Sequence, residues 1–282
     1  MGWLKQSAKQ VLAALPRRVT GPRTVVLCYH SVHPDHPYAS VTPAAFEEHL
    51  TWLAAECDVV PFADVLAPRH SDARPAVALT FDDGYSDNHE FVAPALERHR
   101  LPATFFITTG LIDRATAVIC RFASQRRCLP CDLDTLTWAE IADLRARGFA
   151  IGAHTHTHPV LADLSDAAAR DEMARAKDLL EHRLGFPVTS MAYPYGKLGR
   201  HVSERTLDLA ASVGYHHAAT VRFSGVERGD RPLAVPRFFV AGDNLARLQA
   251  KVRGDWDRIG RWQERAPRWL ARAVSPHDYV LG

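Results

Sequence analysis

The sequence predicts an α/β fold: a deformed (β/α) barrel of about seven strands with outer helices, and helical extensions at both ends. Two observations predict it. Short apolar runs of strand type alternate with helix-type segments from residue 24 to residue 240, and such alternation favours a parallel sheet covered by helices. Polar clusters follow directly after several of the apolar runs. The 282 residues suffice for one such barrel.

The predicted strands are short apolar runs that end at polar or turn-forming residues. They cover residues 25–29, 77–81, 104–108, 149–153, 190–193, 216–220 and 238–240. Residues 112–135 are predicted to be a long connection that could act as a lid. Because the carboxyl ends of parallel strands meet at one rim, the chemistry is expected there.

The predicted helices begin at residues that can cap a first turn. Thr42 precedes Pro43, and this order suits a helix start because threonine caps open N–H groups and proline fits the first helical position. Thr137 and Glu140 form a capping box. Ser165 is predicted to begin a long helix that ends near residue 184.

Three regions are expected along the chain. Residues 21–242 form the barrel domain, residues 1–20 an amphipathic helix, and residues 243–282 a helical, basic and tryptophan-rich tail. The first helix could bind a membrane surface or pack on the domain, and the sequence favours neither. No apolar run near the start is long enough for a signal peptide or a transmembrane helix.

Charge and cysteine content narrow the class of protein. The formal net charge of +2 is too small to indicate a nucleic acid partner. Five cysteines do not resemble a disulfide framework, so we expect a cytoplasmic protein, peripheral to the inner membrane if its end helices bind there. Cys120, Cys128 and Cys131 lack a nearby histidine, which favours loop thiols over a structural zinc site.

A pair of histidines follows the strand predicted at residues 149–153. His154 and His158 are four residues apart, so both imidazoles can reach one ion from one side of a helical turn. With 15 histidines in 282 residues, roughly one such pair is expected by chance. The pair therefore indicates a metal site only together with other ligands at the same rim.

Two adjacent aspartates follow the strand predicted at residues 77–81. Alone, Asp82 and Asp83 before Gly84 favour a solvated turn. At a strand end, however, two carboxylates are unfavourable to bury unless a cation or a proton compensates them. Neighbouring side chains of a strand point in different directions, so one aspartate can bind a metal while the other faces an attacking water. Together with the histidine pair, the metal site is favoured.

Two histidines and one carboxylate form a ligand set that leaves coordination positions open, as in catalytic metal sites. The same set serves non-haem Fe(II) oxygenases. The second carboxylate favours hydrolysis, because it supplies a general base for a water molecule. The expected cofactor is a divalent metal, with Zn²⁺ first and Co²⁺, Ni²⁺ or Fe²⁺ as alternatives.

Three motifs together resemble the polysaccharide deacetylase family, carbohydrate esterase family four, over about residues 24–240. They are Thr80-Phe81-Asp82-Asp83-Gly84, His154-Thr155-His156-Thr157-His158 and Tyr193-Pro194-Tyr195-Gly196. The resemblance implies that Asp82 is the catalytic base. The metal ligands that it implies are Asp83, His154 and His158.

The resemblance gives further residues a role. Thr155 is expected to order its loop by hydrogen bonding. Tyr193, Pro194 and Tyr195 are expected to line the substrate groove. The backbone N–H of Tyr195 would also help to hold the oxyanion that forms during hydrolysis.

The sequence departs from the family pattern at two groups that act together with the base: the arginine that orients it and the general acid. The third motif usually carries an arginine that orients the base, but residues 191–193 are Met-Ala-Tyr. Arg237 could supply that charge or form a surface ion pair, and the sequence favours neither. The late Leu-x-His motif of the general acid is absent after Gly196.

A motif near the N-terminus offers another general acid. Leu27-Cys28-Tyr29-His30 resembles the permuted members that deacetylate bacterial surface poly-N-acetylglucosamine. This resemblance implies that His30 is the acid, since histidine titrates near neutrality. The alternative is a strand-end histidine with a structural hydrogen bond.

The expected function is metal-dependent removal of N-acetyl groups from an amino sugar, an oligosaccharide or a lipid-linked glycan, with release of acetate. Two alternatives stay open. One is hydrolysis of another small or lipid-linked amide, such as a formyl group. The other is carbohydrate binding without turnover, against which the intact aspartates and histidines weigh.

Overall fold

The computed structural model describes residues 23–36, 38–69 and 74–257. The helix expected over residues 1–20 lies outside these ranges. The same holds for the predicted tail beyond residue 257.

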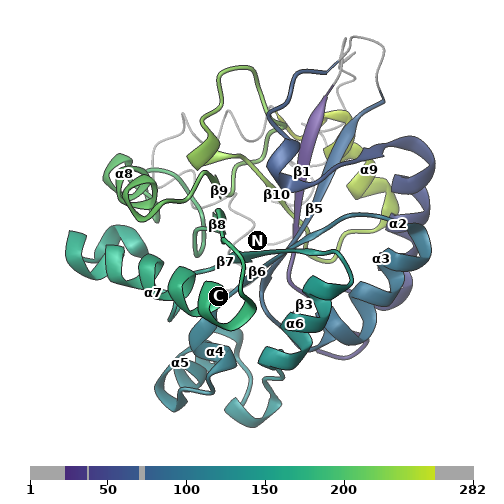
Figure 1. The fold of residues 1–282 in the computed structure, drawn as a ribbon. Coiled ribbons are helices and arrows are strands. Elements are labelled where there is room, and N and C mark those ends of the chain that lie inside the picture. The colour runs from purple at the N-terminus through teal and green to yellow at the C-terminus, as the bar shows by residue number, and fades with distance from the viewer. Residues whose placement is uncertain (1–22, 37, 70–73, 258–282) are drawn as a thin grey trace, which may run out of the picture.

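The described residues form a curled parallel sheet surrounded by helices (Figure 1). In spatial order the strands are β10 (Phe238–Phe239), β1 (Thr24–Tyr29), β5 (Ala76–Asp83), β6 (Thr104–Ile107), β7 (Ala150–Ala153), β8 (Ser190–Ala192) and β9 (His217–Ala219). A parallel bridge between Ala219 and Val235 joins β9 to the segment that leads into β10. The sheet therefore curls into the deformed barrel, and the predicted fold class is confirmed.

Strand register brings the functional motifs to one rim. All residues of β1 and β5 are buried, as expected for apolar strands of a covered parallel sheet, and the two strands pair without a register shift. Farther along the sheet, Asp83 pairs with Ile107, and Ile107 pairs with Ala153. The residues that follow β1, β5 and β7 therefore lie side by side.

Apart from the helices within residues 109–126, which are described below, six α-helices surround the sheet in the described part of the chain (Figure 1). They are α2 (Pro43–Glu56), α3 (Ala93–His99), α6 (Trp138–Ala146), α7 (Asp166–Leu184), α8 (Glu204–Val213) and α9 (Leu245–Arg253). The predicted helix starts are confirmed. Thr42 and Ser165 each accept a backbone N–H of the first turn, and Thr137 forms its capping box with Glu140.

The segment predicted as a long connection, residues 112–135, is mostly helical and packed. It contains the end of α4 (Thr109–Ile112), all of α5 (Thr116–Arg126) and the 3₁₀ turn η3 (Pro130–Asp132). Its apolar residues share a small cluster with the loop after β5, made of Tyr85, Leu111, Val118, Ile119, Phe122 and Leu133. This cluster holds α5 against the rim of the barrel.

Several short elements complete the fold. They are β2 (Ser31–Val32), β3 (Ala39–Val41), β4 (Asp58–Val59), η1 (Phe62–Asp64), η2 (Asn88–Val92), η4 (Leu161–Asp163) and η5 (Pro232–Ala234). Helix α9, in the predicted tail, packs on the domain through buried Leu248 and Val252. Within the described ranges, none of the helices has the length and apolar character that crossing a bilayer requires.

Candidate active site

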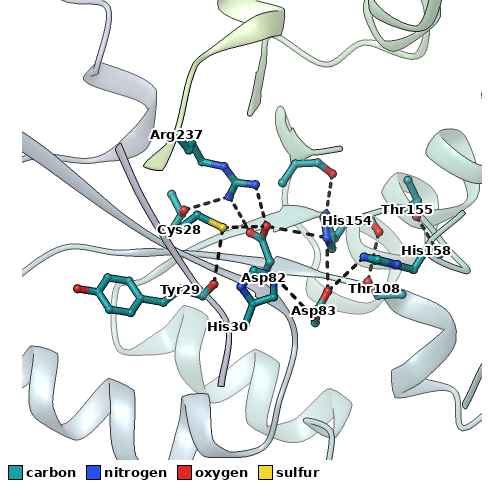
Figure 2. Close-up of polar contacts among 12 residues, drawn as sticks. Cys28, Tyr29, His30, Asp82, Asp83, Thr108, His154, Thr155, His158 and Arg237 are labelled. Carbon is teal, nitrogen blue, oxygen red and sulfur yellow. Dashed lines mark hydrogen bonds and ion pairs between the residues drawn. The ribbon is translucent and has the colours of Figure 1, made fainter. Parts of the chain in front are cut away.

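Three side chains from the ends of β5 and β7 converge at the rim (Figure 2). Oδ1 of Asp83 lies 3.4 Å from Nε2 of His154 and 3.5 Å from Nε2 of His158. All three side chains are buried, and their ligand atoms lie within 4.8 Å of one another. The structure thus brings together the three residues for which the sequence predicts metal binding.

The unpaired atoms of this group suit a divalent metal. Nδ1 of His154 lies 2.7 Å from the carbonyl oxygen of Ala192, so Nδ1 carries the proton and Nε2 presents a lone pair. Oδ1 of Asp83 is buried without a hydrogen-bond partner, which is unfavourable for a carboxylate unless a cation meets it. Imidazole nitrogen and carboxylate oxygen are donors that Zn²⁺ and related ions prefer. The residues therefore fit the implied metal.

An uncommon backbone conformation aims these side chains. Four non-glycine residues of the rim have a positive φ: Asp83 (78°), Thr155 (63°), His158 (57°) and Tyr195 (60°). Residues other than glycine rarely adopt this left-handed region of backbone conformation, and residues held there are often found at functional sites. In the histidine loop, the backbone N–H of His158 donates to Oγ1 of Thr155 at 3.1 Å. This is the kind of contact expected of Thr155.

Asp82 is held by Arg237 rather than by the histidines. Nη1 and Nη2 of Arg237 donate to the two carboxylate oxygens of Asp82, each at 2.7 Å. Arg237 is 0% exposed, so the alternative of a surface ion pair is wrong. Burial raises the pKa of Asp82, but the charges of Arg237 and His154 outweigh burial and lower the pKa to about 2. Asp82 is therefore ionised, as a general base must be.

A second group of candidate ligands lies beside the first. Cys28, His30 and Asp82 also have ligand atoms within 4.8 Å of one another, and the Cys28 thiol donates to Oδ2 of Asp82 at 3.4 Å. Arg237 already occupies both oxygens of Asp82, whereas Asp83 keeps one oxygen without a partner. The Asp83 group is therefore the better metal site.

His30 follows β1 and faces the same rim. Its Nε2 lies 3.9 Å from Oδ2 of Asp83, and its ring packs edge-on against Phe239 with 5.0 Å between centroids. Its Nδ1 is buried without a hydrogen-bond partner among the described residues, so the structural hydrogen bond of the alternative is not seen there. Burial lowers the pKa of His30 to about 4, although Asp83 and Asp82 oppose the shift. The ring is thus uncharged near neutral pH in the free protein.

Most of the third motif is buried, so it supports the site more than it offers surface to a substrate. The Tyr193 ring is only 1% exposed, and its hydroxyl donates to the carbonyl oxygen of Leu233 at 3.1 Å. Pro194 is also buried, whereas Tyr195 is partly exposed. The Tyr195 ring lies 4.9 Å from that of His158. Of the predicted groove residues, Tyr195 is thus the one whose side chain can meet a substrate.

Arg126 is a site residue that the sequence analysis missed. Its Nη2 donates to Oδ2 of Asp83 at 2.7 Å, and its Nε donates to the Tyr85 hydroxyl at 2.9 Å. Burial raises the pKa of Asp83, but Arg126 and the nearby histidines outweigh burial and hold it well below its usual range. The apolar residues Val118, Ile119 and Phe122 have helical spacing, which could have revealed α5 but not the partner of Arg126.

Comparison with known proteins agrees with these motifs. The family model of the polysaccharide deacetylases matches residues 69–218. YxkH of Bacillus subtilis, a putative polysaccharide deacetylase, is 26% identical over 225 residues, which cover 77% of this chain and 71% of that protein. A poly-β-1,6-N-acetyl-D-glucosamine N-deacetylase of Staphylococcus aureus is 21% identical over 222 residues, which cover 74% and 70%.

Two solved structures illustrate the likeness in fold. The deacetylase PplD of Streptococcus pyogenes, solved with acetate, has a TM-score of 0.68 and 22% identity, and covers 83% of this chain and 99% of its own. IcaB from Ammonifex degensii has a TM-score of 0.66 and 23% identity, with the same coverage of 83% and 99%. At these identities the likeness supports the fold.

Proposed function

This chain belongs to the polysaccharide deacetylase family, and we propose that it is a metal-dependent hydrolase that removes N-acetyl groups from an amino-sugar glycan. One observation carries the proposal: two adjacent carboxylates have different partners. Asp83 keeps an oxygen free between two imidazoles, while Asp82 stays ionised beside Arg237. The name of the S. aureus relative supports an N-acetylglucosamine glycan as the substrate class.

Asp83, His154 and His158 would hold the metal, for which we propose Zn²⁺, with Co²⁺, Ni²⁺ or Fe²⁺ as alternatives. Such an ion, when bound, polarises the acetyl carbonyl and acidifies the attacking water. The remaining steps of the reaction are carried out by side chains and backbone groups of the protein.

Asp82 removes a proton from the water as the new bond to the acetyl carbon forms. The backbone N–H of Tyr195 donates to the resulting oxyanion. His30 lies within 4.8 Å of Asp82, so it can receive this proton and pass it to the amide nitrogen. The C–N bond then breaks and leaves acetate and a free amine. The proton thus moves from water to the amine, and no other reactant is needed.

A panel of acylated sugars tests the proposed reaction. N-acetyl chitooligosaccharides, β-1,6-linked N-acetylglucosamine oligomers and a lipid-linked N-acetyl sugar are incubated with the protein, and acetate and free amine are measured by mass spectrometry. Acetate release from a glycan supports the proposal. Release of formate alone from N-formyl counterparts, or glycan binding without any release, would overturn it.

His154→Ala is expected to weaken metal binding and to lower acetate release by at least about 10³-fold, since metal catalysis supplies several kcal/mol of transition-state stabilisation. Bound metal is measured by elemental analysis after dialysis, and acetate release is measured with and without a chelator. His216→Ala is the control, because His216 is exposed and lies just before β9. Full turnover of His154→Ala in the presence of the chelator contradicts this ligand assignment.

His30→Ala is expected to lower the deacetylation of an N-acetyl sugar by about 10²- to 10³-fold, the usual contribution of general acid catalysis. Hydrolysis of 4-nitrophenyl acetate should change far less, because its leaving group departs without a proton. Comparing the two substrates separates proton donation from a structural defect. An equal loss on both substrates would show that His30 is not the acid.

The proposed compartment is the cytoplasm, with contact to the inner membrane surface and access to lipid-linked glycans. All five cysteines are free thiols in the structure, which agrees with a reducing environment. Recovery of the protein from the periplasm on cell fractionation would contradict this assignment.

A further inference from the structure

Helix α5 contacts all three motif loops of the site through one of its faces. Residues 121, 122, 125 and 126 share that face, as helical spacing requires. Its polar contacts join Arg121 to the carbonyl oxygen of Thr157, Gln125 to the hydroxyl of Tyr195 and Arg126 to the carboxylate of Asp83. Phe122 packs edge-on against His158, with 5.2 Å between ring centroids. The helix is therefore part of the site and not only a neighbour of it.

The guanidinium of Arg126 is fixed on three sides. Nε donates to the Tyr85 hydroxyl at 2.9 Å, Nη2 donates to Asp83 at 2.7 Å, and the group lies 4.4 Å from the centre of the Phe122 ring. Its side chain is only 6% exposed. A buried, charge-assisted contact of this kind is strong and fixes the orientation of the carboxylate.

Arg126 divides the two oxygens of Asp83 between different partners. Oδ2 accepts from Arg126, while Oδ1 has no hydrogen-bond partner and faces Nε2 of both His154 and His158. The carboxylate can therefore offer a metal only one unpaired oxygen. Without the guanidinium, rotation of the carboxylate could offer both.

We propose that Arg126 is a positioning residue that restricts Asp83 to a single ligand oxygen. This inference rests on the proposed metal site, whose ligands it orients. Groups that hydrogen-bond to metal ligands commonly influence metal affinity or activity by about 10- to 100-fold. Because Arg126 also places a positive charge beside the site, it does not act by strengthening metal binding.

The test uses Arg126→Met in the full chain, loaded with Co²⁺ as a spectroscopic probe. We expect Co²⁺ to bind at least as tightly as in the unchanged protein, because a positive charge has been removed. The visible absorption spectrum of Co²⁺ should change, since the ligand oxygens change. The kcat for acetate release should fall by about 10- to 100-fold, and Arg126→Lys should restore part of it.

Arg127→Met is the matched control, because Arg127 is the next residue and its side chain is exposed. Its Co²⁺ spectrum and kcat should equal those of the unchanged protein. Tyr85→Phe is a milder variant that removes only the hydroxyl that Arg126 contacts. It should change the spectrum in the same direction, and it tests the proposal if Arg126→Met does not fold.

Two results would overturn the proposal. One is an unchanged Co²⁺ spectrum in both Arg126→Met and Tyr85→Phe. The other is a loss of Co²⁺ affinity beyond about tenfold in a folded Arg126→Met protein, which would make Arg126 a residue that supports binding. Failure of the proposed function looks different: the unchanged protein would then bind no metal, or would bind it and release no acetate.

Discussion

Asp82→Asn is expected to lower the rate of deacetylation by about 10³-fold, within the range that a general base contributes. Asparagine has nearly the same shape, and its amide oxygen can still accept a hydrogen bond from Arg237. It cannot accept the proton of the attacking water. Asp82 lies outside the group formed by Asp83, His154 and His158, so the metal content is expected to stay the same.

The measurement pairs acetate release with metal analysis of the same sample. Asp143→Asn is the control, because Asp143 is an exposed carboxylate on α6. It should leave both quantities unchanged. If Asp82→Asn kept more than about a tenth of the activity, another group would be the base. If it lost its metal, Asp82 would be a ligand instead.

Much of the fold could be predicted because its strands are continuous apolar runs. Every residue of β5 is buried, its two terminal aspartates included, so a run of this kind indicates a covered strand and marks the rim at which it ends. Helix starts were equally readable, because Thr42, Thr137 and Ser165 act through neighbours within four residues. These local sequence patterns were therefore enough to predict the rim of the barrel and the metal ligands that lie on it.

Residues far apart in the sequence were harder to assign. Arg237 meets Asp82 across 155 positions, and Arg126 meets Asp83 across 43. No local pattern encodes such contacts, because register and barrel closure decide them. Residues 112–135 were expected to be a connection although Val118, Ile119 and Phe122 have helical spacing, and most of their buried apolar residues pack in the small cluster around Tyr85 rather than in the main core. The sequence therefore located the ligands, offered Arg237 only as one of two alternatives, and did not point to Arg126.

Arg237→Met is expected to destabilise the protein by about 3–5 kcal/mol, the usual loss when one partner of a buried ion pair is removed. Asp82 would be left buried, with the Cys28 thiol as a weak hydrogen-bond donor. Its pKa, now about 2, should rise because burial then acts without the opposing charge of Arg237. Methionine fills much of the same space, so a large cavity is not the cause.

This change has a definite pH dependence. In the unchanged protein the pKa of Asp82 lies below its unfolded value, so this group stabilises the fold above that value, and the contribution is lost as pH falls towards about 2. In Arg237→Met the folded pKa should lie above the unfolded value. The folded state then favours the protonated carboxyl, so the stability deficit should be larger at pH 7 than at pH 5.

A double-mutant cycle separates the ion pair from other effects of the substitution. Urea unfolding is measured for Arg237→Met, for Asp82→Asn and for the two combined. The combined variant should be more stable than the sum of the single losses predicts, because no unpaired charge remains buried. Arg205→Met, which breaks a surface ion pair with Asp166, should lose less than about 1 kcal/mol. Additive losses in the cycle would show that Arg237 stabilises the barrel through packing and not through its ion pair with Asp82. Another group would then have to keep Asp82 ionised.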